Sequence, residues 1–292
     1  MPDTFTIAAV QMKIAPDRET NLAKAEAGIA EAAKRGAQVV CLPELFTGYY
    51  FCQKEDVALF DLAEPIPGPS AERLARAARA NKVVVIGSLF ERRMAGVYHN
   101  TATVHAATGE LMGIYRKMHI PDDPLFLEKF YFTPGDLGFK VFDTPAAKVG
   151  TLVCWDQWYP EAARLTAMQG AEVIFYPTAI GWHPREKAEY GVPQHNAWKT
   201  SMVGHAIANG TYVCAVNRVG HEVIVGEGLE FWGRSFVSDP FGRILWEGST
   251  DKEEVGVVTC DRKLMEDVRR NWPFFRDRRI DAYGNITKRV SD

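Results

Sequence analysis

A cysteine, a glutamate and a lysine each follow a predicted strand in this sequence of 292 residues. Cys154 ends the apolar run 149–153, Glu44 follows the apolar run 39–42 and a proline, and Lys117 follows a third run. Loops at the ends of strands often carry functional groups. A thiol, a base that removes its proton and a cation beside the developing oxyanion are the groups that acyl transfer through a covalent intermediate requires.

Each of these residues also has an ordinary structural explanation. A cysteine at the end of an apolar strand is usually a small core residue, and most lysines are simply solvated. Cys154 is distinguished by Pro160, which can begin a helix, because a strand-to-helix turn can expose a thiol near a helix N-terminus and favour the thiolate. A helix cap or a surface turn would explain Glu44, whereas burial would raise its pKa toward the value that a general base needs.

Alternating helices and strands are predicted around these positions. A helix over 21–35 precedes the strand 37–42, which leads to Glu44, and the order helix, strand, proline recurs at 161–177. Several strands are apolar on both faces, which is typical of sheets covered by helices. No linker rich in glycine, serine or proline divides the chain, so we expect one α/β domain over residues 1–292.

The composition argues against several classes of protein. The net charge is −3 and no long basic run is present, so the electrostatic surface of a nucleic-acid-binding protein is missing. No apolar run reaches the ~18 residues of a membrane span, and the N-terminus lacks the pattern of a signal peptide. The five cysteines form no CxxC pair and no zinc-ligand spacing with histidines, so we expect no metal site and a reducing, cytoplasmic compartment.

Three segments around these residues resemble the signature segments of the nitrilase superfamily of carbon–nitrogen hydrolases, in the same order. Two further segments match as well, so that the resemblance extends from residue 7 to about residue 283. The matching segments are 42–46, 115–119, 132–135, 153–156 and 239–242. The resemblance implies an α/β fold of four layers, an α-β-β-α sandwich.

The resemblance also implies roles for individual residues. Cys154 would be the nucleophile, Glu44 the general base, and Lys117 would lie beside the developing oxyanion. The backbone N–H of Trp155 would be a second donor to that oxygen. Glu128 would be a further carboxylate lining the pocket near the lysine, although a surface charge explains it equally well. The family's reaction requires no metal and no organic cofactor.

The segments 117–124, 154–161 and 179–183 resemble the N-carbamoylputrescine amidohydrolase branch of that superfamily. The resemblance implies hydrolysis of N-carbamoylputrescine to putrescine, carbon dioxide and ammonia, a step of polyamine biosynthesis from arginine through agmatine. A carbamoylase or amidase that acts on another small substrate, such as an N-carbamoyl amino acid or an aliphatic amide, is the main alternative. A member that binds without catalysis is disfavoured because all three catalytic positions are occupied.

The distal ammonium of N-carbamoylputrescine has a pKa of about 10, like that of lysine, so its pocket should offer a carboxylate. Carboxylates in loops expected to border the site are Asp122, Asp123, Glu186 and Glu189. The ring of Tyr50 could pack against the apolar four-carbon chain of this substrate. Arg185 and Lys187 lie in one of the same loops and would instead suit an anionic substrate, which leaves the charge of the substrate open.

The C-terminal segment, about 265–292, is unusually aromatic at 271–277. Exposed apolar stretches generally mark contacts, so we expect this segment to lie at a subunit interface. Members of the superfamily form dimers and larger assemblies built from dimers, and the resemblance therefore implies a homo-oligomer.

Overall fold

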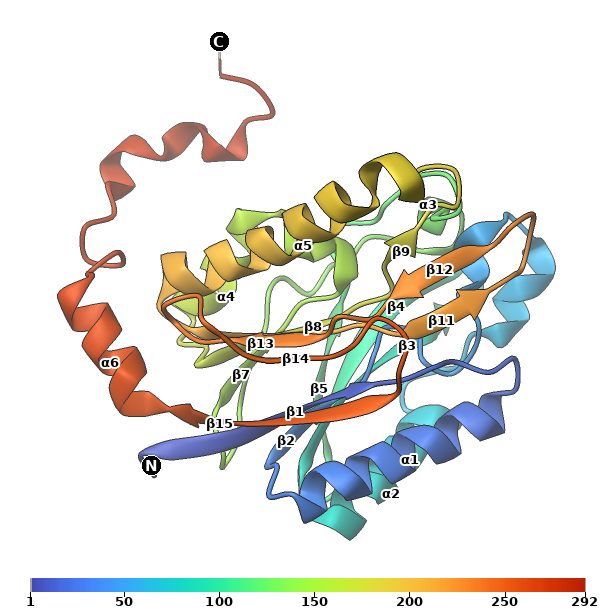
Figure 1. The fold of residues 1–292 in the computed structure, drawn as a ribbon, viewed down its shortest axis with the longest axis horizontal. Coiled ribbons are helices and arrows are strands. Elements are labelled where there is room, and N and C mark those ends of the chain that lie inside the picture. The colour runs from blue at the N-terminus through green and yellow to red at the C-terminus, as the bar shows by residue number, and fades with distance from the viewer. Residues whose placement is uncertain (1, 292) are drawn as a thin grey trace.

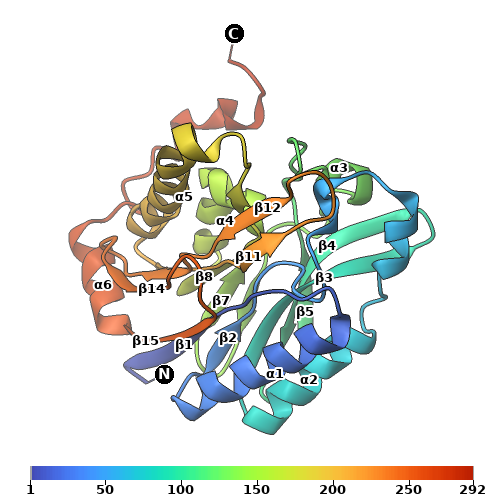
Figure 2. The same ribbon diagram turned by 45° about the vertical axis from the view of Figure 1, so that its right-hand side comes forward.

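Two six-stranded sheets pack face to face within residues 2–291, the part of the chain that the computed structural model describes (Figure 1). Helices cover the outer face of each sheet, so the layers follow the order helix, sheet, sheet, helix (Figure 2). This is the α-β-β-α sandwich that the resemblance to the nitrilase superfamily implies, and that expectation is confirmed.

The first sheet combines the N-terminal strands with a strand from near the end of the chain, which pairs antiparallel with β1 along its full length. In order, its strands are β15 (Glu254–Asp261), β1 (Thr4–Gln11), β2 (Val39–Cys41), β3 (Val84–Met94), β4 (Val97–His105) and β5 (Leu111–Arg116). Helices α1 (Arg18–Lys34) and α2 (Pro69–Asn81) cover its outer face.

The second sheet has parallel pairing at its centre, where β8 lies between β7 and β10. In order, its strands are β14 (Ile244–Glu247), β13 (Phe236–Ser238), β10 (Tyr212–Val216), β8 (Val173–Pro177), β7 (Lys148–Thr151) and β6 (Val141–Asp143). Helices α4 (Pro160–Met168) and α5 (Lys187–Asn209) cover its outer face.

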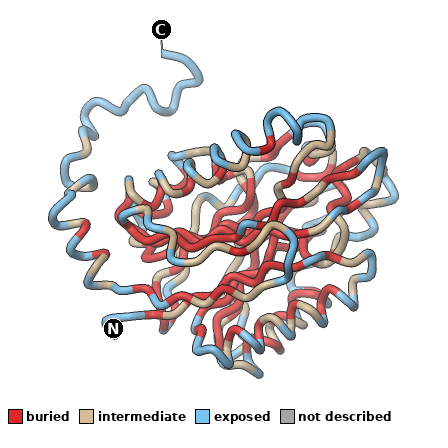
Figure 3. The backbone as a smooth tube through the Cα atoms, in the orientation of Figure 1, coloured by how far each residue is buried: buried red, intermediate tan, exposed pale blue. Residues whose placement is uncertain are grey.

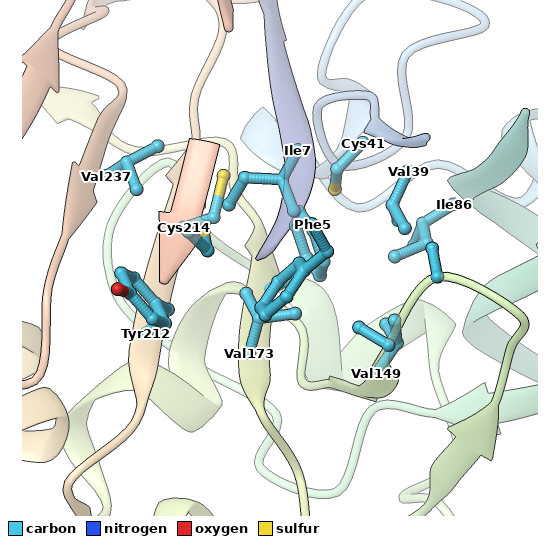
Figure 4. Packing of buried hydrophobic residues seen from close by; sticks show 14 of the residues in the cluster. Phe5, Ile7, Val39, Cys41, Ile86, Val149, Val173, Tyr212, Cys214 and Val237 are labelled. Atoms are coloured by element: carbon cyan, nitrogen blue, oxygen red, sulfur yellow. The ribbon is translucent and has the colours of Figure 1, made fainter. Parts of the chain in front are cut away.

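Apolar side chains on both faces of the strands hold the layers together. In β1, Ile7 and Ala9 belong to the core between the two sheets, while Ala8 and Val10 pack under the helices, as the alternation of side chains along a strand requires. Figure 4 shows this inter-sheet core, in which Phe5 lies close to Val173. The strands therefore need apolar residues at consecutive positions.

Two helices begin earlier than the sequence predicts. The side chain of Asp17 accepts a hydrogen bond from the N–H of Thr20 at 2.8 Å and starts α1 before the predicted residue 21. Helix α5 begins at Lys187 and continues through Pro193, whereas the sequence predicts a start at His195. No helix within residues 2–291 is long and apolar enough to cross a membrane.

A small third sheet and several short helices lie where the two large sheets open at one end (Figures 1 and 2). The sequence does not predict this sheet, whose strands in order are β11 (Val219–Glu222), β12 (Leu229–Trp232) and β9 (Gly181–Trp182). The short helices at this end are Phe51–Gln53, Val57–Leu62, α3 (Glu128–Tyr131) and Cys154–Trp158, whereas Ile280–Ala282 and Gly284–Thr287 belong to the C-terminal tail (Figure 1). These elements contribute most of the loops around the site described below.

Helix α6 (Arg262–Asn271) and the segment after it extend away from the sandwich (Figures 1 and 3). Met265 and Val268 of α6 are buried in the chain's own core. The segment that follows is largely exposed, including the apolar side chains of Phe274 and Ile286. The C-terminal region thus divides into an anchored helix and an exposed tail.

Truncating a buried leucine of α2 tests how much the packing of this helix on the first sheet contributes to the free energy of unfolding. Leu74 is fully buried, so we expect Leu74→Ala to lower the free energy of unfolding by about 3 kcal/mol through lost burial and the cavity that remains. Denaturant unfolding followed by circular dichroism measures this change. The control Leu245→Ala alters an exposed leucine and should cost less than about 1 kcal/mol. Equal losses in the two variants would contradict the assignment of the core.

Candidate active site

The ends of three strands bring Glu44, Lys117 and Cys154 to the same end of the sandwich. Glu44 follows β2 and Lys117 follows β5, both in the first sheet, whereas Cys154 follows β7 in the second. All three residues are buried, with at most 4% of their surface exposed. The site therefore depends on how the two sheets are packed together.

The ammonium of Lys117 lies between two buried carboxylates. Its Nζ donates hydrogen bonds to Oε1 of Glu44 at 2.8 Å and to Oε2 of Glu128 at 2.6 Å. Asn100 also donates to Oε1 of Glu44, at 2.6 Å, while Oε2 of Glu44 is buried without a hydrogen-bond partner. Glu44 thus keeps one oxygen that can accept a proton.

Burial and charge pull the pKa values of this cluster in opposite directions. Burial raises the pKa of Glu128 to about 7, although Lys117 beside it and the hydroxyl of Tyr50, which donates to it at 2.6 Å, both favour the charged form. Burial alone would lower the pKa of Lys117, but the adjacent carboxylates of Glu128 and Glu44 outweigh that effect and raise it well above its usual range. The charged form of the lysine is therefore favoured.

Cys154 occupies a sharp turn with an unusual backbone conformation. Its φ of +42° falls in the left-handed region, which residues other than glycine seldom adopt. The chain passes from β7 through the short helix Cys154–Trp158 before α4 begins, so that the N–H of Trp155 belongs to a first helical turn and has no partner within that turn. Burial, and then the nearby carboxylate of Glu44, raise the pKa of the Cys154 thiol well above its usual range. The resting thiol is therefore protonated.

A buried ion pair that the sequence does not predict fixes the loop after Glu44. Arg218 donates to the carbonyl oxygens of Glu44 at 2.6 Å and Leu45 at 2.9 Å, and to Glu222 at 2.9 Å. Glu222 in turn accepts the N–H of Tyr50 at 2.6 Å. Arg218 stands two residues after the end of β10, and a charged residue just beyond an apolar strand was a usable signal, since Glu44 also stands just beyond such a strand.

A cavity of about 410 Å³ leads to Cys154. Both Glu128 and Trp155 line it, as expected from the sequence, and Trp158, Ile180 and Trp232 supply apolar walls. The remaining lining residues are Pro121, Asp123, Pro124, Phe126, Ala179, Gly181, His183, Glu186, Gln194 and Ala197. The lining therefore includes several carboxylates but neither lysine nor arginine among the described residues.

Tyr50 does not line the cavity, contrary to expectation. It is fully buried, because its N–H bonds to Glu222 and its hydroxyl bonds to Glu128. Its side chain therefore holds the carboxylate of Glu128, which lines the cavity, and is not itself in a position to contact a bound substrate.

Only some of the expected loop carboxylates reach the cavity. Pro121 and Asp123 line it, whereas Asp122 is exposed and lies outside the lining. Glu186 lines it, and Gln194 donates to its Oε2 at 2.8 Å. Glu189 is exposed on the first turn of α5 and lies outside the lining.

The cations of the same loop are directed elsewhere. Lys187 forms an ion pair with Glu230 and lies over the ring of Trp182, 4.8 Å from its centroid. Arg185 is exposed and does not line the cavity. The described residues of the cavity wall thus present a negative surface to a bound molecule.

Comparisons with known proteins agree with this geometry. Residues 6–270 match the carbon–nitrogen hydrolase family. An N-carbamoylputrescine amidase of Arabidopsis thaliana is 43% identical over 95% of this chain and 93% of its own length, and a citrullinase of Francisella tularensis is 40% identical over 97% and 98%. The crystal structure of a carbon–nitrogen hydrolase from Helicobacter pylori G27 has a TM-score of 0.95 and 44% identity, and covers 99% of this chain and 100% of that one.

A more distant solved structure bears on the chemistry. An amidase from Nesterenkonia sp. AN1 is 26% identical, with a TM-score of 0.72 over 92% of this chain and 99% of that one, and carries acrylamide added to its active site cysteine. The fold, the family match and these relatives agree with one another. The chain belongs to the carbon–nitrogen hydrolase family of the nitrilase superfamily and is an enzyme that hydrolyses amide bonds.

Proposed function

We propose that the enzyme hydrolyses N-carbamoylputrescine to putrescine, carbon dioxide and ammonia, with Cys154 as nucleophile. The observation that carries the substrate assignment is the cavity wall, where Asp123 and Glu186 place carboxylates and no lysine or arginine lies among the described lining residues. A substrate with a distal ammonium suits such a wall, whereas a carboxylate would be repelled. The identity to enzymes named N-carbamoylputrescine amidase supports the same assignment.

Glu44 acts as the general base because the Cys154 thiol is protonated at rest and its proton must be removed for attack. The free Oε2 of Glu44 accepts that proton as the sulfur bonds to the ureido carbon. One C–N bond of the tetrahedral intermediate then breaks, and the departing nitrogen takes the proton from Glu44. Water gives a proton to Glu44 as its oxygen bonds to the thioester carbon; the C–S bond then breaks, and Glu44 returns the proton to the Cys154 sulfur. The carbamic acid formed in the reaction loses carbon dioxide.

Lys117 and the N–H of Trp155 stabilise the oxyanion of each tetrahedral intermediate. Lys117 is buried and its charged form is favoured, so its field is little screened by solvent. Glu128 holds the ammonium from the other side, and the hydroxyl of Tyr50 keeps Glu128 in place. The pair of carboxylates therefore fixes the cation in position before substrate binds.

We further propose that the enzyme works in the cytoplasm, in polyamine biosynthesis from arginine through agmatine. Its five cysteines are all free and buried, which suits a reducing compartment. The pathway follows from the proposed substrate and product.

We propose that the chain, 1–292, is one domain that assembles into a homo-oligomer built from dimers; residues 1 and 292 lie outside the described part. The α4–α5 face has an apolar hollow of about 950 Å³, bordered by Leu165, Met168, Ile207 and the tail residues Phe274 and Ile286. Exposed apolar surface of this kind supports the expected interface of the segment 265–292. Because α6 is anchored in its own subunit, the interface role belongs mainly to the residues after Asn271.

Replacing the proposed nucleophile tests the mechanism. We expect Cys154→Ala to lower kcat by about 10⁴-fold or more, because no other group can form the thioester. A steady-state assay of ammonia release measures the loss, and mass spectrometry checks that iodoacetamide no longer labels this position. Cys260→Ala, which alters a buried core cysteine, should retain kcat. Substantial activity in Cys154→Ala would exclude the thioester route.

The pKa of Glu128 predicts the acid limb of the pH profile. Since this pKa is raised to about 7 and the carboxylate form is needed to hold Lys117, activity should fall as the pH drops through about 7. Tyr50→Phe removes a hydrogen bond that lowers this pKa, so the acid limb of kcat/KM should move to higher pH. An unchanged limb in Tyr50→Phe would show that another group controls it.

A substrate series tests the charge of the cavity. We expect N-carbamoylputrescine to be turned over with a much higher kcat/KM than butylurea, its neutral analogue, or than citrulline and N-carbamoyl-β-alanine, which carry a carboxylate. Glu186→Gln and Asp123→Asn should each raise KM for the cationic substrate by about tenfold, the effect of one charged hydrogen bond, and leave butylurea unchanged.

Two neighbouring carboxylates outside the cavity provide matched controls for this series. Glu189→Gln and Asp122→Asn remove the same charge nearby and should leave KM within about twofold of the wild-type value, because neither side chain lines the cavity and charges farther from the bound substrate are screened. Preferred hydrolysis of citrulline by the wild-type enzyme would replace N-carbamoylputrescine with a ureido amino acid as the substrate and keep the cysteine chemistry.

A further inference from the structure

A carboxylate that does not line the cavity joins the two halves of the site. Asp156 is completely buried, two residues after Cys154. Its Oδ1 accepts hydrogen bonds from the backbone N–H of His119 at 3.0 Å and from the ring Nδ1 of His119 at 2.7 Å. Its Oδ2 accepts the hydroxyl of Tyr115 at 2.7 Å and the backbone N–H of Val153 at 2.9 Å. Four donors therefore converge on one side chain.

The partners of Asp156 flank both residues of the proposed chemistry. Tyr115 and His119 stand two residues before and two residues after Lys117, and Val153 directly precedes Cys154. We propose that Asp156 is a positioning residue that sets the place of the Cys154 thiol relative to the Lys117 ammonium. This inference rests on the proposed roles of Cys154 and Lys117. The hydrogen bonds of Asp156 do not depend on those roles.

The backbone at Cys154 needs such a restraint. A left-handed conformation outside glycine costs on the order of 1–3 kcal/mol and persists only where the surroundings enforce it. Asp156 closes the turn from both sides, because its N–H donates to the carbonyl oxygen of Val153 at 3.1 Å while its side chain accepts the N–H of the same residue. Cys154 lies inside this double link and cannot relax without breaking it.

The lysine side of the link is also held firmly. The ring of His119 stacks on that of Tyr159, with centroids 3.7 Å apart and planes only 6° from parallel. An ionised carboxylate only accepts hydrogen bonds, so the Nδ1 of His119 carries the proton that faces Asp156. Tyr159 directly precedes α4, and the network thus ties the chain after β5 to the helical layer of the second sheet.

The chemistry of an amide shows why the carboxylate is required. Asparagine has the same shape but accepts hydrogen bonds at one atom only, and its NH₂ group would face either Val153 N–H or the two His119 donors. The hydroxyl of Tyr115 could accept a hydrogen bond from the NH₂ group, but a backbone N–H can only donate one. Asp156→Asn therefore releases the cysteine turn or the lysine segment, and a misplacement of 1 Å at a reacting group can cost about 10²-fold in rate.

Kinetics of Asp156→Asn separate positioning from folding. We expect kcat to fall by about 10²-fold while KM stays within about threefold of the wild-type value, because Asp156 does not line the cavity. The rate of Cys154 alkylation by iodoacetamide should also change, and this readout needs no substrate. A kcat within twofold of wild type, with only the unfolding midpoint lowered, would reduce Asp156 to a structural residue and overturn the proposal.

A pair of tyrosine variants keeps the test decisive even where Asp156→Asn does not fold. Tyr115→Phe removes one hydrogen bond to Asp156, whereas Tyr176→Phe removes one from an equally buried tyrosine whose hydroxyl lies 3.1 Å from Nδ1 of His205. Both should lose similar stability, about 1 kcal/mol, but only Tyr115→Phe should lower kcat, by several-fold. Equal kcat values in the two variants would contradict the positioning role.

These measurements also distinguish failure of the inference from failure of the proposed function. If the wild-type enzyme prefers another amide or ureido compound, the same variants are compared on that substrate, and the positioning role stands or falls there. If Cys154→Ala retains activity, the proposed mechanism fails and the positioning role fails with it. If only the Asp156 and Tyr115 variants behave like wild type, the mechanism stands and this inference is wrong.

Discussion

The ammonium of Lys117, held between the carboxylates of Glu44 and Glu128, is the constraint on which the rest of the site depends. A buried charge is tolerated only when it is paired and hydrogen-bonded. The three side chains share two hydrogen bonds and bear a net charge of −1 when both acids are ionised. Removing Lys117 would leave two buried carboxylates without a cation between them, and removing either carboxylate would take away one of the two hydrogen bonds that hold the ammonium in place.

The two large sheets divide the chemistry between them. The first sheet delivers Glu44 and Lys117 from the ends of β2 and β5, and the second delivers Cys154 from the end of β7. Two buried networks then fix the loops at these ends. The pair of Arg218 and Glu222 holds the loop of Glu44, and the bonds of Asp156 link the lysine segment with the cysteine turn. Hydrogen bonds to other chain segments therefore hold the loop of Glu44, the lysine segment and the cysteine turn in place.

Sequence patterns predicted the alternating helices and strands and the strand ends that carry Glu44, Lys117 and Cys154, because both follow local rules. Apolar strands that end at Glu44, Lys117 and Cys154 are visible as runs of residue types, and resemblance to the nitrilase superfamily supplied their roles. The start of α5 was missed because Pro193 normally interrupts a helix, yet the chain continues through it. The helical conformation of residues 187–194, which end at the cavity-lining Gln194, was therefore not predicted.

Contacts between segments that lie far apart in the chain could not be predicted from the sequence. The aromatic character of Tyr50 suggested a wall of the pocket, but its direction is decided by Glu222 and Glu128, which lie far along the chain. Asp156 was visible only as part of a signature segment, since its partners come from two different sheets. Long-range hydrogen bonds of this kind have no periodic signal, so only coordinates reveal them.

Part of the cavity wall comes from the loop 121–126 and from the N-terminal half of α5. Neither segment adds a strand to the large sheets. Substitutions in these two segments can change the shape and charge of the wall while the buried ions stay in place. Substrate preference can therefore evolve separately from the reaction. An engineer who wants a different amide cleaved would randomise these two segments and leave the strand ends untouched.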